Sequence, residues 1–234
     1  MAEPRTVVVT GGTGALGRAV TASFVALGDR VHVTWLNESE IPPFRDALGN
    51  DVDGVQLHQA DVSDPDTVQI LFDAVQAASG PVTVLANIVG GFAYAPITDT
   101  SAGVWDRMLR LNATTAFLCC RAALPQMRSM GRGRIINVAA HPALSGEGAN
   151  MSAYSASKAA VWNLTQSLAR EVGGTGITIN AVLPSIIDTG ANREAMPDAD
   201  RSRWLAPADI ARVMSWLASD EAAIVSGSAL RLTG

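Results

Sequence analysis

The chain has 234 residues, of which 48% are hydrophobic and 17% are charged, and its formal net charge is -5. This length suits one α/β domain, and the mildly acidic charge with scattered arginines excludes the basic surface that nucleic-acid binding requires. No apolar stretch is long enough to span a bilayer. Strand-like sequence begins almost at once, so we expect no signal peptide. The adjacent Cys119 and Cys120 favour a reduced, cytoplasmic protein in which both are small core residues rather than a redox pair.

Apolar runs of strand length alternate with longer segments of helical spacing. We predict strands at 6–10, 30–35, 54–60, 81–87, 133–140, 176–184 and 228–234. We predict helices at 15–28, 64–79, 103–129, 151–172 and 208–219, and an irregular segment at 185–207. Continuous β-branched strands, each followed by a helix, indicate a parallel sheet covered on both faces. The sequence therefore predicts a single domain, 1–234, of the Rossmann-type doubly wound α/β class, with about seven strands in the order 3-2-1-4-5-6-7.

A glycine-rich turn, VVVTGGTGALG (7–17), joins the first strand to the first helix. Gly11 allows the tight turn, and Gly17 lets the helix pack closely on the sheet. The N-terminus of that helix presents backbone N–H groups and a positive dipole end, which bind a pyrophosphate. We therefore expect a dinucleotide to contact this turn through Gly11, Thr13, Ala15, Leu16 and Gly17.

The choice of nucleotide is set where the second strand ends. An acidic residue there binds the adenosine ribose of NAD, whereas a nearby arginine holds the extra phosphate of NADP. The turn contains Thr34, Trp35, Leu36 and Asn37, which include neither. Trp35 either flanks the adenine or packs in the protein. Because no carboxylate in this turn would repel the phosphate, we predict NADP(H) in preference to NAD(H).

Lys158 is the single lysine among 17 basic residues. It follows Tyr154 by four positions, which places both side chains on one face of a helix. The pKa of a tyrosine is near ~10 when unperturbed, and a nearby cation lowers it. A compact ammonium group also bonds ribose hydroxyls in a way that the planar guanidinium of arginine does not. We therefore predict that Tyr154 is a general acid–base and that Lys158 lowers its pKa.

The glycine turn and the Tyr154–Lys158 pair together resemble the short-chain dehydrogenase/reductase family over essentially the whole chain. The resemblance implies an NAD(P)H-dependent oxidoreductase in which Asn112 anchors a water molecule of the proton relay. It also implies further cofactor contacts, which are Asp61, Val62, Asn87, Pro184, Ile187 and Thr189. Asp61 could instead cap the next helix. Ala15, Ile88, Val89 and Ser185 depart from the family pattern.

The family's catalytic serine is missing from the end of the fifth strand. Ala139 and Ala140 occupy its position in INVAAHPAL, and alanine cannot donate a hydrogen bond to a substrate carbonyl as charge develops on it. His141 or Ser145 could replace the serine, or neither does.

This alanine pattern is similar to one branch of the family, the quinonoid dihydropteridine reductases. Their first turn, the apolar stretch corresponding to IVGGF (88–92) and the segment after the sixth strand also resemble this chain. The last of these similarities implies that the segment 185–207 covers the substrate. A quinonoid ring is already polarised, so hydride can reach it without the serine. Asn112 and the missing acidic residue at position 35 argue against identity with a dihydropteridine reductase. The sequence therefore leaves three classes of hydride acceptor open, which are a ketone, an imine and a quinonoid ring.

The expected substrate pocket includes Gly91, Phe92, His141, Arg193 and Trp204, and we identify no metal-binding set. Arg193 could equally be a solvated charge, and Trp204 a packing anchor. A competing hypothesis is a cofactor-binding protein of this fold with a non-redox role, such as a cyclase, a sensor or a structural partner. The resemblance further implies a homodimer or homotetramer acting on a small molecule.

Overall fold

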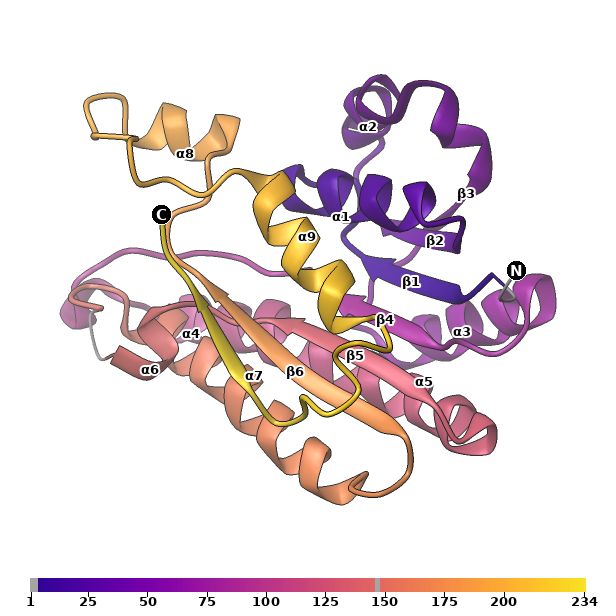
Figure 1. Cartoon of the computed structure of the whole chain (residues 1–234). Helices are drawn as coiled ribbons and strands as arrows, with labels where there is room; N and C mark the ends of the chain where they lie inside the picture. The colour runs from indigo at the N-terminus through magenta and orange to yellow at the C-terminus, as the bar shows by residue number, and fades with distance from the viewer. Residues whose placement is uncertain (1–3, 146–147) are drawn as a thin grey trace.

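Seven parallel strands form one sheet in the order β3-β2-β1-β4-β5-β6-β7, as the sequence predicts (Figure 1). The computed structural model describes residues 4–145 and 148–234. The strands are β1 (Thr6–Thr10), β2 (Arg30–Trp35), β3 (Val55–Gln59), β4 (Val84–Asn87), β5 (Gly133–Val138), β6 (Ile177–Pro184) and β7 (Ala229–Leu232). β1 pairs with both β2 and β4, so the strand order reverses there. In open α/β sheets, ligands bind outside the carboxyl ends of the strands at such a reversal.

Helices cover both faces of the sheet (Figure 1). They are α1 (Ala15–Ala26), α2 (Ile41–Leu48), α3 (Pro65–Ser79), α4 (Ala102–Met108), α5 (Thr115–Met130), α6 (Pro142–Ser145), α7 (Ser152–Glu171), α8 (Gly190–Ala195) and α9 (Pro207–Leu217). Helices α1 and α9 pack together on one face, and α3, α5 and α7 lie on the other. Within the described residues, no helix combines the length and the apolar character that crossing a membrane requires.

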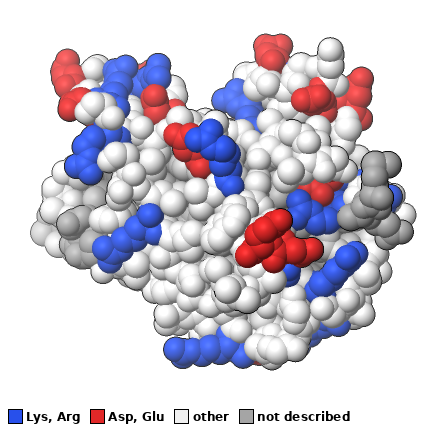
Figure 2. Space-filling view, viewed as in Figure 1, with Lys and Arg blue, Asp and Glu red and all other residues white. Residues whose placement is uncertain are grey.

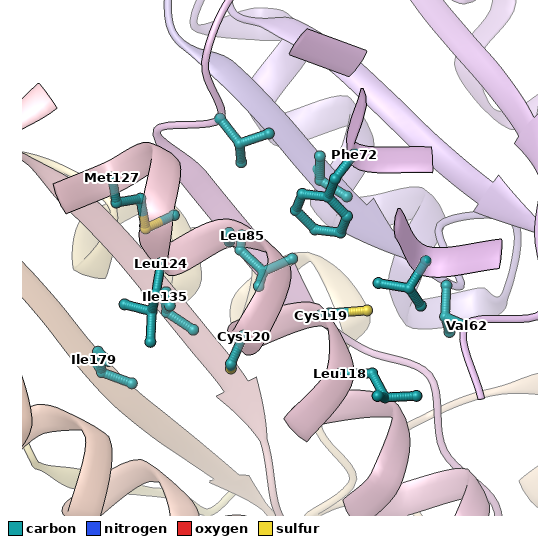
Figure 3. Packing of buried hydrophobic residues seen from close by; sticks show 14 of the residues in the cluster. Val62, Phe72, Leu85, Leu118, Cys119, Cys120, Leu124, Met127, Ile135 and Ile179 are labelled. Carbon is teal, nitrogen blue, oxygen red and sulfur yellow. The ribbon is translucent and has the colours of Figure 1, made fainter. Parts of the chain in front are cut away.

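The core between the sheet and helices α3 and α5 includes both cysteines (Figure 3). Cys119 and Cys120 are fully buried and free, among apolar neighbours such as Phe72, Leu85 and Ile135. Burial raises the pKa of the Cys120 thiol to about 12, so it stays protonated at neutral pH. The interpretation of the two cysteines as core residues is confirmed.

Several segments differ from the sequence prediction. The long helix expected at 103–129 changes to a π-helical turn at Leu109–Thr114, between α4 and α5. The segment 185–207, expected to be irregular, contains α8. Helix α2 was not predicted, and its Pro42 and Pro43 lie in the first turn, where proline is tolerated.

A buried hydrogen-bonded chain connects two neighbouring strands to helix α3. Nδ1 of His32 lies 2.9 Å from Nε2 of His58, and Nε2 of His32 lies 2.9 Å from the hydroxyl of Ser79. His32 is fully buried, and its burial, together with His58, lowers its pKa to about 4. The folded protein therefore holds this imidazole neutral where an unfolded chain would protonate it.

Acid should destabilise the fold through this histidine. Because the folded pKa of His32 lies below its ordinary value of 6.5, its stabilising contribution is complete above pH 6.5 and is lost as the pH falls toward 4. We expect that loss to reach about 3 kcal/mol. Urea denaturation at a series of pH values should show a shallower decline in the free energy of unfolding for His32→Gln than for wild type. Parallel declines in the two proteins would contradict this assignment.

Candidate active site

A cavity of about 420 Å³ opens at the carboxyl ends of β1, β2 and β4. Its lining comes from the glycine turn, the end of β2, the segment after β3, the segment after β4 and the π-helical turn. The lining residues are Gly11, Gly14, Ala15, Leu16, Gly17, Thr34, Trp35, Leu36, Asn37, Glu40, Ala60, Asp61, Val62, Ile88, Val89, Gly90, Leu111, Thr115 and Thr189. Thr189 precedes α8 and Glu40 precedes α2, and the surface is hollowed between the parts that hold these two helices (Figure 2). The cavity therefore lies at the strand reversal.

The glycine turn has the geometry of a phosphate cradle. Gly11 adopts a φ of +64°, and its N–H donates to the Thr34 hydroxyl at 2.9 Å, which ties the turn to β2. A Cβ on Gly17 would lie 2.2 Å from the Gly11 carbonyl oxygen, so only glycine allows this close approach. Helix α1 begins after Gly14, which provides no side-chain cap. Its first N–H groups therefore suit an anionic ligand, and this turn fits the pyrophosphate of a dinucleotide.

Asp61 and Val62 line the same cavity beyond β3. Asp61 accepts hydrogen bonds from the backbone N–H and the hydroxyl of Ser63, and these bonds hold its pKa below the ordinary value. It also pairs with Arg110 at 3.2 Å. The alternative role of helix cap belongs instead to Asp64, which accepts from the N–H of Thr67 at the start of α3.

Lys158, Asn112 and the segment after β4 meet at one point. Lys158 is 4% exposed, and its Nζ donates to the Val138 carbonyl at the end of β5 at 2.8 Å. A Cβ on Gly90 would lie 2.6 Å from Oδ1 of Asn112 and 3.1 Å from Nζ of Lys158. Gly90 also lines the cofactor-sized cavity. The lysine and the asparagine are not lining residues themselves, but both lie next to Gly90, which is one.

Asn112 holds the segment after β4 through both ends of its amide. Its Oδ1 accepts from the N–H of Gly91 at 3.0 Å, and its Nδ2 donates to the Gly91 carbonyl at 3.1 Å and to the Ser157 hydroxyl at 2.9 Å. The π-helical turn carries this side chain, and Asn112 is 1% exposed. Because its amide is engaged in this way, Asn112 positions Gly91 against α7.

Tyr154 lies one turn before Lys158 on α7 and contacts Phe92 edge-to-face, with ring centroids 4.9 Å apart. Burial raises the pKa of Tyr154 to about 12 and lowers the pKa of Lys158 to about 8. The expectation that the lysine brings the tyrosine pKa below its ordinary value is therefore wrong for this structure, because desolvation of the phenolate prevails. The phenol is neutral at neutral pH, which suits a proton donor.

Six expected cofactor contacts lie outside the cavity lining, and Tyr154 and Lys158 are two of them. The Thr13 hydroxyl donates to the carboxylate of Glu40, and Asn87 donates to Asn137 at 2.8 Å within the core. Pro184 is buried at the end of β6, and Ile187 forms a bridge with Leu205. Expected contacts that do line the cavity are Gly11, Ala15, Leu16, Gly17, Trp35, Asn37, Asp61, Val62 and Thr189.

The expected substrate residues fall into two groups. Phe92 contacts Tyr154, and Gly91 is bonded to Asn112, so both lie next to residues that the sequence predicts to be catalytic. Arg193 instead pairs with Asp188 at 2.6 Å, and Trp204 stacks with Arg201.

Ala139 and Ala140 are buried directly after β5, so no hydroxyl stands at the family serine position. The backbone N–H of His141 donates to the Pro184 carbonyl at 3.3 Å, which places this histidine between the ends of β5 and β6. Ser145 ends helix α6, and its side chain lies outside the part of the chain that the structure describes.

Sequence reasoning missed Thr34, Glu40 and Gly90. In the sequence, Thr34 bears on nucleotide choice only because it is not acidic, whereas in the fold its hydroxyl anchors the glycine turn. Glu40 lies beyond the turn that was considered, and a 3-10 segment, Glu38–Glu40, brings it back to the cavity. Gly90 carried a usable signal, since a glycine pair after a buried strand marks a close approach.

Comparisons with known proteins agree with this geometry. The chain matches the family profile described as short chain dehydrogenase over residues 5–200. It is 31% identical to D-threitol dehydrogenase of Mycolicibacterium smegmatis, over 99% of this chain and 92% of the relative. It is also 31% identical to 3-oxoacyl-(acyl-carrier-protein) reductase of Escherichia coli, over 99% of this chain and 97% of the relative. A crystal structure of a variant actinorhodin polyketide ketoreductase with NADPH superposes with a TM-score of 0.91 at 27% identity, over 99% of this chain and 97% of that one.

The chain therefore belongs to the short-chain dehydrogenase family, and it is an oxidoreductase enzyme of that family. An NAD(P) cofactor is typical of such enzymes, and the cavity at the glycine turn fits one. These comparisons establish the broad resemblance and give no support to the narrower one with dihydropteridine reductase.

The close approach at the glycine turn gives a matched pair of variants. In Gly17→Ala the new methyl group meets backbone atoms of Gly11 and Gly12, so we expect a loss of about 2 kcal/mol in the free energy of unfolding. In Gly14→Ala the nearest atom, the Gly11 carbonyl oxygen, is 3.4 Å away, so the change should stay below about 1 kcal/mol. Urea denaturation of both variants measures this difference, and equal effects would contradict the packing described.

Proposed function

We propose that this protein is an NAD(P)H-dependent reductase of a small-molecule carbonyl compound, with Tyr154 as the proton donor. The observation that carries the proposal is the meeting of Lys158 and Asn112 at Gly90, one helical turn from Tyr154, because Gly90 lines a cavity that also includes the phosphate cradle. Gly90 thus connects the proposed reaction centre with the cavity that fits a dinucleotide.

Tyr154 and its neighbours have separate roles in proton transfer. A nicotinamide cofactor supplies the hydride when bound. The neutral phenol of Tyr154 gives its proton to the acceptor oxygen, and the ammonium of Lys158 stabilises the phenolate that remains. The Val138 carbonyl orients this ammonium, and its other N–H groups are suited to ribose hydroxyls. Asn112 acts as a positioning residue because it fixes Gly91, next to Phe92.

A carbonyl acceptor is favoured by two of the relatives, which are a 3-oxoacyl-(acyl-carrier-protein) reductase and a polyketide ketoreductase. Such an acceptor develops negative charge on its oxygen, and a hydrogen-bond donor stabilises that charge. Since Ala139 and Ala140 provide none, the hydroxyl of Tyr154 is the donor to that oxygen, and His141 is the nearest further candidate along the chain.

The missing serine also supports a second class of acceptor. A quinonoid ring or another already polarised acceptor takes up hydride without an alkoxide that needs a second donor. A panel of ketones, imines and a quinonoid dihydropterin, assayed with NADH and NADPH, separates the two classes. Turnover of the quinonoid compound alone would favour this second class.

The chain contains two tyrosines, which allows a matched test of the proton donor. Tyr154→Phe removes the phenolic proton and should lower kcat at least about 100-fold while dinucleotide binding persists. Tyr94→Phe serves as the control, because Tyr94 is 62% exposed and its hydroxyl accepts only from Asn150 among the described residues. Steady-state oxidation of the reduced cofactor measures both. Full activity in Tyr154→Phe would contradict the proposed mechanism. A wild-type protein that binds a dinucleotide but turns over no acceptor would favour a non-redox role.

The lowered pKa of Lys158 predicts a pH dependence. Below about pH 8 the amine is protonated and stabilises the phenolate, whereas above it the charge is lost. We therefore expect kcat/KM for reduction to fall as the pH rises through about 8, since this parameter reports the free enzyme. In Lys158→Arg the cation persists, so activity should be lower but the decline near pH 8 should disappear. The same decline in the variant would assign it to another group.

A further inference from the structure

We propose that Glu40 selects the nucleotide, so that the protein binds NAD(H) in preference to NADP(H), contrary to the expectation drawn from the turn after β2. This inference rests on the proposed function of the cavity as a dinucleotide site. It concerns a residue that lies outside that turn in the sequence and reaches the cavity only through the fold.

Glu40 lies at the adenosine end of the cavity. It shares the lining with Trp35 and Asn37 at the end of β2 and with Gly14 in the glycine turn. In this class of fold, the end of the second strand is where a carboxylate accepts from the hydroxyls of the adenosine ribose. The Glu38–Glu40 segment turns the chain back after Asn37, which gives Glu40 the position that an acidic residue at the end of β2 would otherwise hold.

The side chain of Glu40 is held in place from the glycine turn. The Thr13 hydroxyl donates to Oε2 of Glu40, and Thr13 is 2% exposed, so this contact is buried at its inner end. Oε1 has no hydrogen-bond partner within residues 4–145 and 148–234. A carboxylate with one oxygen anchored and the other available can accept from a ribose hydroxyl. Thr13 is thus a positioning residue for Glu40.

The charges around the cavity oppose a further phosphate. Among its lining residues the charged ones are Glu40 and Asp61, and no lysine or arginine is included. Residues 36–54 contain five carboxylates and one arginine, and acidic groups gather over the region of α2 in Figure 2. Arg18 on α1 lies outside the lining and donates to the Pro43 carbonyl at 3.2 Å. Asp61 is already paired with Arg110, whereas Glu40 has no ion-pair partner among the described residues. A 2′-phosphate beside Glu40 would therefore meet an unbalanced negative charge, which disfavours NADP(H).

The test compares dissociation constants for NADH and NADPH, measured by titration calorimetry without any acceptor. We expect the wild type to bind NADH at least about tenfold more tightly than NADPH. Glu40→Gln removes the charge and should bring the ratio of the two constants toward one, by tightening NADPH and weakening NADH. Thr13→Val, which removes the anchor of the carboxylate, should weaken NADH binding while leaving the discrimination against NADPH partly in place.

Two control variants keep the test specific. Glu38→Gln removes an exposed charge from the same 3-10 segment outside the cavity lining, and it should leave the ratio unchanged. Arg18→Gln should also leave it unchanged, whereas a selective loss of NADPH affinity in that variant would overturn the proposal by showing a cation for the phosphate. A wild type that prefers NADPH, or an unchanged ratio in Glu40→Gln, would overturn it as well. Failure to bind either nucleotide would instead refute the proposed dinucleotide site, and the inference with it.

Discussion

A buried ammonium group is the constraint on which the reactive end of this protein depends. Lys158 is almost completely removed from solvent, and desolvation of its charge is unfavourable enough to bring its pKa to about 8. The Val138 carbonyl, at the end of β5, offsets part of that cost. The site is consequently arranged so that helix α7, strand β5 and the segment after β4 converge on one side chain, and Gly90 leaves the space it needs.

The same convergence explains why a π-helical turn lies between α4 and α5. Asn112 reaches both backbone polar groups of Gly91 and the hydroxyl of Ser157, which links the segment after β4 to helix α7. π-helical turns often occur at functional sites because they redirect a side chain without ending the helix. Phe92, next to Gly91, then packs against Tyr154. The position of the Tyr154 ring is therefore set by a chain of contacts that begins at Asn112.

The family and its fold leave two properties of the site open, and individual side chains decide them. The similar structure with NADPH has the same fold, yet the cavity in this chain is lined by two carboxylates and no cation. Likewise, the end of β5 is preserved while the hydroxyl expected there is replaced by Ala139 and Ala140. Fold and function are separable for this reason, because nucleotide choice and acceptor chemistry depend on a few groups at the edge of the sheet.

Local patterns in the sequence determined the alternation of strands and helices, the glycine turn and the Tyr154–Lys158 pair, because each depends on residues that are close together along the chain. The strand order followed from the class of fold that this alternation indicates. Only the tertiary structure decided which partners those residues have. In the folded chain, Thr13 donates to Glu40 and Asn87 donates to Asn137. Burial also raises the pKa of Tyr154. Burial and long-range contacts are set by how distant segments pack, so the charges that surround a site cannot be read from the segment that carries its motif.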